Sequence, residues 1–487
     1  MIEDIGLLTI NVVRTGGSSG SLSVQYSTSD VTTIAGQDYV ATSGTLVFGP
    51  GETTKSFAIQ INNDVITEPD ETFKVRLFNG PNQDSLGSPS EQIITIQDSS
   101  TVPALSTSNR TVNEGAGKVD VTVNLSAATG RAVAVSWSSA DTAGSQNCNL
   151  VNGRASSRCD YISTYGRLEF APGETSKTIT VLLIDDSYAE GNETFSVVLF
   201  APTGATLSPT TSTITVTDNG DTNGPNPIDQ AGFFVRQHYL DFLNREPDED
   251  GFNFWTKEIT DCGSDPACIE VKRINVSAAF FLSIEFQQTG YLVYRFYKSA
   301  YGNIPGAPVP LILPEFLADT QRIGKGVIVG STGWETVLEN NKVAFAVAFV
   351  TRPRFTGEYP TTLTPAEFVD ALFTNAGVTP STADRDGAID EFNGAGNTAD
   401  TAARARALRR VAENATLVQQ EFNRAFVLMQ YFGYLRRNPN EAPEPGLNFD
   451  GYNFWLGKLN DFNGNYITAE MVKAFISSAE YRQRFGP

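Results

Sequence analysis

The sequence predicts a multidomain β + α protein, in which two antiparallel β-sandwiches are followed by an all-α helical repeat domain. Residues 1–219 alternate apolar and polar side chains over short runs, and turn-forming stretches such as "TGGSSG" and "FGPGET" separate these runs, as in sandwich domains. Residues 220–229 form a polar linker rich in Gly, Pro and Asn, and beyond it the apolar spacing becomes helical. A chain of 487 residues is also long enough for three domains of roughly 150 residues each.

The β half is a tandem repeat, which divides it into sandwich 1 (residues 1–100) and sandwich 2 (residues 101–219). The stretch "GQDYVATSGTLVFGPGETTKSFAIQI" (36–61) recurs as "RCDYISTYGRLEFAPGETSKTITVLL" (158–183), a shift of 122 positions. Glu3 and Glu114 are only 111 positions apart, so sandwich 2 carries an insertion, which contains "CNLVNGRASSRC". In "KVDVTVNL", Val119, Val121 and Val123 share one face because side chains alternate across a strand.

The helical half, residues 230–487, repeats more weakly, and we divide it into four units: 233–290, 291–357, 366–424 and 426–486. The outer units are the most similar, since "FVRQHYLDFLNREP" (234–247) matches "FVLMQYFGYLRRNP" (426–439). Trp255 and Trp455 fall at helical spacing beside apolar residues, and we expect them in the core. "DEDG" and "DRDG" look like calcium loops but lack the ligand at the twelfth position, so we expect them to cap helix N-termini.

Composition and motifs argue against several classes of function. The net charge is −20 and every part of the chain is acidic, which excludes a nucleic-acid partner because such partners need basic patches. His238 is the only histidine and lies within a helical pattern, which leaves little room for histidine-based catalysis. No nucleophile elbow, P-loop, zinc-protease motif or dinucleotide fingerprint is present. We therefore expect a protein that is not an enzyme. An unrecognised hydrolase remains a third alternative, because paired carboxylates are defined only in three dimensions.

The four cysteines form two close pairs, Cys148 with Cys159 and Cys262 with Cys268. Two local disulfides are the favoured interpretation and indicate an oxidising, exported setting. A zinc site would require all four to converge from two domains. No run of about 20 apolar residues exists, so no membrane span is expected. The chain opens within a strand pattern, "MIEDIGLLTINV", and we interpret it as a fragment or mature portion of a secreted protein, with an export signal upstream.

The stretch "IDDSYAEGNETF" (184–195) places four carboxylates at the exit of a buried strand. Like charges repel, so either water screens them or a cation holds them together. Calcium takes six to eight oxygen ligands, and strand ends gather at the poles of a sandwich. The alternative is a set of solvated acidic turns. The candidate calcium ligands of sandwich 2 are Glu114, Asp160, Asp185, Asp186, Glu190, Glu193 and Asp218.

Sandwich 1 repeats this pattern with less charge. We align Asn62 and Asn63 with Asp185 and Asp186, so amide oxygens would replace carboxylates. We therefore expect weak calcium sites, about one per sandwich, with tighter binding in sandwich 2. The weaker candidates of sandwich 1 are Glu3, Asp38, Asn62, Asn63, Asp64, Glu68, Glu71 and Asp98.

The signature E…GxDY…G-hydrophobic-x-F-x-PGE…DD…E…E-x-F…D resembles the Calx-beta domain, first described in sodium–calcium exchangers and common in bacterial surface proteins. The first copy lacks the DD pair, and the second reads "RCDY" at the GxDY position. The resemblance implies immunoglobulin-like sandwiches with calcium at one pole, and it places the exchanger-type ligands on the seven residues of sandwich 2. Both copies lack the acidic run after the last strand, having "DSS" and "DNG", which argues against several ions per domain.

The helical half resembles a bacterial domain of unknown function, number 4214. The resemblance rests on "YLDFLNREPDEDGFNFW" and "FLSIEF" near its start and on "YFGYLRRNPN…DGYNFW" near its end. It implies an exported, multidomain bacterial setting and no particular chemistry.

These observations favour a structural or adhesive extracellular protein that is stabilised by calcium, with self-assembly into a filament or surface layer as an extension. The expected partners are further copies of the chain, as a homo-oligomer or polymer, or other cell-surface proteins. A strand from a neighbouring chain could complete sandwich 1. The alternative is an extracellular binding module, whose helical domain recognises a peptide or glycan and whose sandwiches serve as a stalk.

Overall fold

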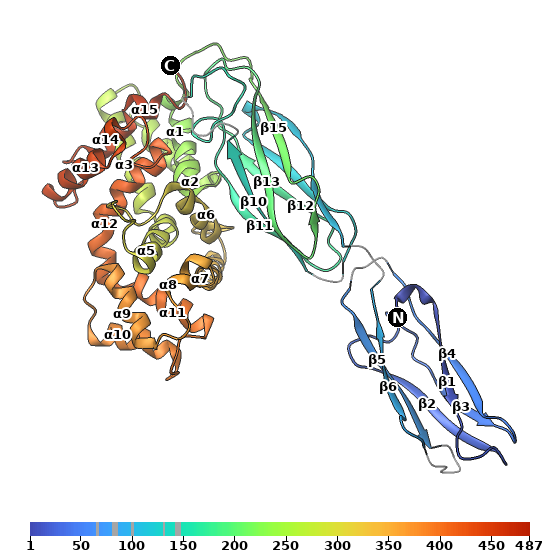
Figure 1. Ribbon diagram of the computed structural model, residues 1–487. Helices are drawn as coiled ribbons and strands as arrows, with labels where there is room; N and C mark the ends of the chain where they lie inside the picture. Colours follow the sequence, from blue (N-terminus) through green and yellow to red (C-terminus); the bar gives the residue numbers. More distant parts are fainter. Residues whose placement is uncertain (65–67, 80–85, 99–101, 130–131, 142–147) are drawn as a thin grey trace.

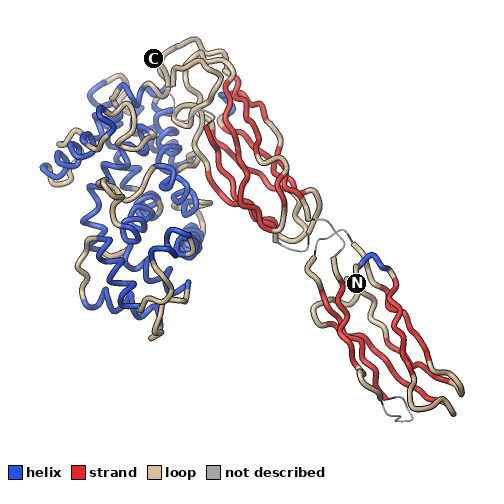
Figure 2. The backbone as a smooth tube through the Cα atoms, viewed as in Figure 1, coloured by secondary structure: helices blue, strands red, loops and turns tan. Residues whose placement is uncertain are grey.

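The computed structural model describes residues 1–64, 68–79, 86–98, 102–129, 132–141 and 148–487. The two sandwiches follow each other end to end, and the helical region lies beside sandwich 2 (Figure 1). Strands run along the length of both sandwiches, whereas the long helices are confined to the C-terminal region (Figure 2). β-sandwich domains followed by a helical region are thus confirmed.

Sandwich 1 packs a two-stranded sheet, β1-β4, against a four-stranded sheet of order β3-β2-β5-β6. All pairings within these sheets are antiparallel. Its core includes Tyr39, Phe48, Ile59 and Phe73, each at most 1% exposed. Its strands are β1 (Leu7–Val13), β2 (Leu22–Asp30), β3 (Ser43–Phe48), β4 (Thr54–Gln60), β5 (Glu71–Asn79) and β6 (Glu91–Ile96).

Sandwich 2 repeats this arrangement with additional strands. Its sheets have the orders β11-β10-β13-β15-β8 and β12-β9-β7-β14. β8 runs parallel to β15 and β14 runs parallel to β7. In sandwich 1 an isolated parallel bridge from Ile2 to Gln97 takes the place of the β8–β15 pair, and none of the strands in the described residues corresponds to β7. The strands are β7 (Ala104–Thr107), β8 (Arg110–Asn113), β9 (Lys118–Leu125), β10 (Val133–Asp141), β11 (Tyr165–Phe170), β12 (Ser176–Leu182), β13 (Glu193–Thr203), β14 (Thr206–Leu207) and β15 (Thr211–Thr217).

The helical region shares one large hydrophobic core, which also takes in Ile162 and Ile184 from sandwich 2. Its helices are α1 (Ala231–His238), α2 (Glu249–Thr260), α3 (Pro266–Leu282), α4 (Ile284–Gln288), α5 (Gly290–Tyr301), α6 (Leu313–Gly324), α7 (Trp334–Val350), α8 (Pro353–Glu358), α9 (Pro365–Ala376), α10 (Thr382–Ile389), α11 (Thr401–Ala412), α12 (Ala415–Met429), α13 (Asp450–Asp461), α14 (Met471–Ile476) and α15 (Ala479–Arg482).

The two outer helical segments share an irregularity. A π-helical turn follows α1 at Tyr239–Leu243, and another follows α12 at Gln430–Leu435. Each ends at a residue with left-handed backbone, Asn244 (φ 52°) and Arg436 (φ 53°). The similar sequences of these segments therefore adopt the same unusual backbone.

Several local predictions can be compared with the structure. Both predicted disulfides form. Asp248 of "DEDG" caps α2 by accepting a hydrogen bond from the Gly251 amide, as predicted. For "DRDG" the prediction was wrong, because Ser381 is the cap of α10 and Asp384 lies inside its first turn. Among the helices described, none combines the length and the apolar character that crossing a bilayer requires.

His238 is buried and its ring lies between the Phe234 carbonyl and the Ser277 hydroxyl, at 2.7 and 2.9 Å. Burial lowers its pKa to about 4, so the imidazole is neutral at physiological pH. This is the environment of a packed core histidine.

Candidate metal centre

The carboxylates of sandwich 2 gather at the pole next to the helical region. Glu114 lies in the short 3-10 turn before β9. Asp160 follows the disulfide-bearing loop, Asp185 and Asp186 follow β12, and Glu190 precedes β13. Because consecutive strands end at this pole, residues far apart in sequence lie within contact distance.

Six acidic side chains form two triads. The inner triad is Asp160, Asp186 and Glu190, and the outer triad is Glu114, Asp185 and Asp221. Within each triad, one carboxylate oxygen per residue lies within 4.8 Å of the others. Glu114 connects the triads, since its Oε1 accepts a hydrogen bond from the Asp186 amide at 2.9 Å.

The inner triad is strongly desolvated. Asp160 and Asp186 are only 6% and 5% exposed. Burial raises the pKa of Asp160 to about 7, and burial together with Asp160 and Glu114 raises the pKa of Glu190 to about 9. The pKa of Asp186 also rises well above its ordinary value, again through burial first and neighbouring carboxylates second. The metal-free site therefore holds protons where a cation would otherwise balance the charge.

One oxygen in each triad is buried without a hydrogen-bond partner among the described residues. These atoms are Asp186 Oδ2 and Asp221 Oδ2. Asp186 Oδ1 does accept a hydrogen bond, from the Tyr188 amide at 2.7 Å. A buried carboxylate oxygen without a donor is costly, and a cation at the triad would satisfy it.

The outer triad is more open. Burial raises the pKa of Glu114 to about 8. Asp185 accepts a hydrogen bond from Asn219 Nδ2 at 2.6 Å, and burial raises its pKa. Asp221 was not among the predicted ligands, because it lies in the stretch interpreted as a linker. Its position three residues after Asp218 is the only signal that could have indicated it.

Glu193 and Asp218, the remaining candidates of sandwich 2, lie outside the triads. Burial, then the charges of Asp160 and Glu190, raises the pKa of Glu193 to about 10. Burial raises the pKa of Asp218, but hydrogen bonds from four backbone amides outweigh it and lower the pKa overall. The donors are the amides of Glu190, Gly191, Gly220 and Asp221. Asp218 thus holds the Glu190 loop in place, and its role as a ligand stays a prediction.

Among its described residues, sandwich 1 contains one triad, Asp38, Glu68 and Glu71, and all three side chains are partly exposed. Burial raises the pKa of Glu71 to about 7, with Asp38 as the next cause. Asp98 accepts a hydrogen bond from the Glu68 amide, just as Asp218 does from Glu190. The other candidates, Glu3, Asn62, Asn63, Asp64 and Asp98, lie outside this triad and stay predictions as ligands.

The predicted alignment of the two asparagines is wrong by one residue. Tyr39 bridges to Ile61 as Tyr161 bridges to Leu183, which makes Asn62 the counterpart of Ile184. The amide of residue 62 bonds the Asp38 carbonyl as the amide of residue 184 bonds the Asp160 carbonyl. Asn63 therefore replaces Asp185, and Asp64 keeps the carboxylate of Asp186. Sandwich 1 lacks a carboxylate of the outer triad and retains those of the inner one.

The loops that carry the triads of sandwich 2 are bonded to the helical region. The Ser187 amide and the Tyr188 hydroxyl donate to the carbonyls of Phe485 and Gln483, at 3.0 and 3.1 Å. Arg236 Nη2 donates to the Leu183 carbonyl at 3.2 Å, and Arg484 Nε donates to the Arg158 carbonyl at 2.7 Å. Each contact lies within two residues of a triad member, so the pole is also a joint between domains.

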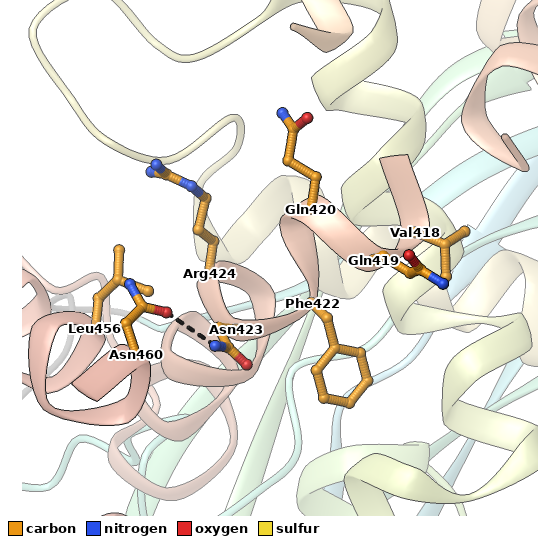
Figure 3. A pocket seen from close by; sticks show the side chains of 8 residues that line it. All are labelled: Val418, Gln419, Gln420, Phe422, Asn423, Arg424, Leu456 and Asn460. Carbon is orange, nitrogen blue, oxygen red and sulfur yellow. Dashed lines mark hydrogen bonds between the residues drawn. The ribbon is translucent and has the colours of Figure 1, made fainter. Parts of the chain in front are cut away.

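A separate cavity of about 580 Å³ lies on the helical region, between α12 and α13. Figure 3 shows the hydrogen bond between Asn423 and Asn460, with Arg424 directed away from the Phe422 ring. The lining residues are Val418, Gln419, Gln420, Phe422, Asn423, Arg424, Leu456 and Asn460. No Trp or Tyr is among them, although such side chains usually form the stacking surface for a sugar.

Two β-sandwiches in tandem, each with carboxylates gathered at one pole, define the class of protein that this part of the chain represents. In agreement, the model of the Calx-beta domain matches residues 1–100 and 97–220. The chain therefore contains two tandem Calx-beta domains, and this part of the sequence-based resemblance is confirmed.

Curated relatives are similar to part of the chain. Human "Sodium/calcium exchanger 3" is 32% identical over 225 residues, which cover 41% of this chain and 23% of the relative. "Sodium/calcium exchanger Calx" of Drosophila melanogaster is 30% identical over 205 residues, covering 42% of this chain and 20% of the relative. The chain thus spans about a quarter or less of the length of these relatives.

Solved structures are also similar to part of the chain. The apo-form Calx CBD1 domain is 38% identical and covers 20% of this chain and 86% of its own, with a TM-score of 0.20. The calcium binding domain CBD12 of CALX1.1 is 27% identical and covers 43% of this chain and 78% of its own, with a TM-score of 0.21.

Proposed function

We propose that residues 1–220 form a non-enzymatic calcium-binding module that holds Ca²⁺ at the pole of each sandwich and binds it more tightly in sandwich 2. The observation that carries the proposal is the inner triad. Its three carboxylates lie close together, and one of their oxygens, Asp186 Oδ2, is buried without a hydrogen-bond partner. The names of the related calcium-binding domains support the same reading.

The donor set favours calcium over other metals. Both triads offer only carboxylate oxygens, which suit hard cations, whereas zinc and copper sites use histidine or cysteine. The only histidine is buried in the helical region and all four cysteines are in disulfides. Sandwich 2 offers two positions that share the loop of Asp185 and Asp186, and sandwich 1 offers one.

In this proposal calcium acts mechanically. A cation at the inner triad fixes Asp160 and Asp186, whose neighbours Arg158 and Ser187 are bonded to residues 484 and 485. A ligand that binds only the folded form adds stability of RT ln(1 + [L]/Kd), about 2.7 kcal/mol at ~100 times Kd. Calcium would therefore stiffen both the loops and the joint with the helical region.

We further propose that the protein works outside the cell as a structural or adhesive component, and that residues 230–487 belong to the bacterial domain of unknown function 4214. Two disulfides suit an oxidising compartment, where weak millimolar calcium sites suffice. The elongated arrangement of the two sandwiches (Figure 1) suits a stalk or a filament subunit. Electron microscopy of the purified protein would distinguish a polymer from a monomer.

The calcium proposal is tested by calorimetry and thermal unfolding of the whole chain, with Asp186→Asn as the variant and Glu169→Gln as the control. Glu169 lies on exposed β11, with its side chain 77% exposed. We expect calcium to raise the unfolding midpoint of the wild type and the control, and to raise that of Asp186→Asn much less. An equal midpoint with calcium and with chelator for the wild type would overturn the proposal.

The second candidate is a binding module, and the polar cavity between α12 and α13 is the observation that favours it. Its amide groups and Arg424 suit a polar or anionic peptide or sugar better than an apolar one. Arg424→Ala should then abolish binding in a glycan and peptide array screen. If the wild type retains no ligand on such arrays, this candidate loses its support.

A further inference from the structure

We infer that the Cys148–Cys159 disulfide positions Asp160 and Asp186 for the cation, so that the calcium affinity of the inner triad depends on whether the disulfide is oxidised or reduced. The inference rests on the proposed calcium function and adds a positioning element that lies outside the ligand set.

The disulfide is joined directly to the first ligand. Cys159 is fully buried and precedes Asp160 in the chain. The turn that contains both is closed by hydrogen bonds from the amides of Cys159 and Asp160 to the Ser156 carbonyl, at 3.1 and 2.9 Å. The Ser156 amide in turn donates to Asp160 Oδ2 at 2.5 Å. The bridge to Cys148 therefore anchors the turn that aims the Asp160 carboxylate.

The second ligand is reached through Tyr188. Tyr188 packs with Cys148 and Cys159 in a small buried cluster. The Tyr188 amide donates to Asp186 Oδ1 at 2.7 Å. This leaves Oδ2, the unpartnered oxygen, as the atom available to a cation. The disulfide thus precedes Asp160 directly and packs against Tyr188, so it lies beside two loops that each carry one ligand of the same triad.

Sandwich 1 provides an internal comparison. It contains no cysteine, and its Asp38 turn keeps the corresponding hydrogen bond, from the Ile34 amide to Asp38 Oδ2 at 2.6 Å, without a disulfide. Its triad is partly exposed, whereas Asp160 and Asp186 are buried. The insertion found only in sandwich 2 therefore accompanies the more enclosed of the two sites.

The redox step is an ordinary thiol–disulfide exchange. A small dithiol supplies two electrons and two protons, the S–S bond breaks, Cys148 and Cys159 become thiols, and the dithiol closes to its own disulfide. The 5.7 Å separation of the two Cα atoms is then no longer imposed by a covalent bond. The Asp160 turn is then no longer anchored to Cys148, and the packing surface beside Tyr188 is loosened, which weakens the shared cation site.

The experiment measures calcium binding by calorimetry and the calcium-induced shift of the unfolding midpoint. It uses the whole chain as the oxidised wild type, as Cys148→Ser/Cys159→Ser, and as Cys262→Ser/Cys268→Ser. The last variant is the matched control, because its disulfide joins the end of α2 to α3, away from the triads. We expect the first variant to lose about tenfold to 100-fold in inner-triad affinity, as for other residues that orient metal ligands. We expect the control to match the wild type.

A disulfide that only stabilises the fold would lower the unfolding midpoint equally with calcium and with chelator, leaving the calcium-induced shift unchanged. A folded Cys148→Ser/Cys159→Ser protein with wild-type affinity would overturn the inference. If that variant does not fold, the Cys262→Ser/Cys268→Ser protein reduced with a dithiol decides in the same way, because Cys148–Cys159 is then the only disulfide to reduce. Absence of calcium binding by the oxidised wild type would overturn the proposed function itself, together with this inference.

Discussion

Individual carboxylates decide how the two sandwiches differ. Sandwich 1 keeps Asp64 at the position of Asp186 but has Asn63 at the position of Asp185. The difference in charge therefore falls on the outer triad, where an amide oxygen is a weaker ligand than a carboxylate. At this scale a one-residue error in alignment changes which site is weakened.

Asn63→Asp should raise the calcium affinity of sandwich 1, because it restores the carboxylate that corresponds to Asp185. Calorimetry of this variant in an Asp185→Asn/Asp186→Asn background, which removes one carboxylate from each triad of sandwich 2, isolates sandwich 1. Asn62→Asp is the matched control. Asn62 occupies the position of Ile184, and its amide nitrogen donates to the Gln37 carbonyl at 2.8 Å. A carboxylate there would face a carbonyl, so affinity should not rise. Equal gains from both variants would contradict the register of the two repeats.

At the scale of elements, strand ends and loops bring carboxylates together at one pole of sandwich 2, which makes its stability depend on pH. In the metal-free protein, burial raises the pKa of Glu114 from 4.5 to about 8 and that of Glu190 from 4.5 to about 9. The folded state thus binds protons more tightly than the unfolded state. The stability linked to these groups is fully present below about pH 4.5 and is lost as the pH rises through 8 to 9.

We therefore expect the thermal unfolding midpoint of sandwich 2 in chelator to decrease as the pH rises from about 5 to about 9. Calcium should remove most of this fall, because the cation replaces the protons. Thermal unfolding across this pH range, with chelator and with calcium, measures both slopes. Glu190→Gln should flatten the slope in chelator. A chelator profile that rises with pH would contradict the assigned pKa shifts.

The joint between sandwich 2 and the helical region contains a fully buried ion pair. Arg484 and Asp241 are both 0% exposed, with Arg484 Nη1 and Asp241 Oδ2 2.9 Å apart. Arg484 also donates to the Arg158 carbonyl across the joint. Removing one partner leaves an uncompensated buried charge, so Arg484→Ala should destabilise the helical region by about 3–5 kcal/mol. Chemical denaturation measures the loss, and Arg482→Ala, whose pair with Asp229 is partly exposed, is the control with a small effect. Comparable losses in both variants would contradict the special role of the buried pair.

At the scale of the whole molecule, the metal pole of sandwich 2 is bonded to the C-terminal residues 483–485. We expect calcium to slow hydrogen exchange in residues 480–487 as well as in the triad loops. Tyr188→Phe removes the bond from its hydroxyl to the Gln483 carbonyl and keeps the ring beside the disulfide. It should speed exchange in residues 480–487 with little change in calcium affinity. Exchange in residues 480–487 that is the same with and without calcium would show that the joint does not respond to the ion.

Some of this arrangement could be predicted from the sequence, and the rest could not, for physical reasons. Strand alternation and the 122-residue repeat indicated the two sandwiches, and cysteine spacing indicated both disulfides. Asp221 was missed because nothing in "TDNGDTNGPNPID" shows that the chain folds back over the pole after β15. The joint was equally hidden, since bonds such as Ser187 to Phe485 connect residues 298 positions apart. Contacts of that range depend on how the domains dock, which local patterns do not specify.

The most direct test of the central claim is a crystal structure of the whole chain grown in calcium, with anomalous difference maps calculated at both triads. We expect a peak coordinated by Asp160, Asp186 and Glu190, with Asp186 Oδ2 among the ligands, and a weaker peak at Glu114, Asp185 and Asp221. A well-ordered sandwich 2 with no anomalous peak at either triad would contradict the claim that these carboxylates bind calcium.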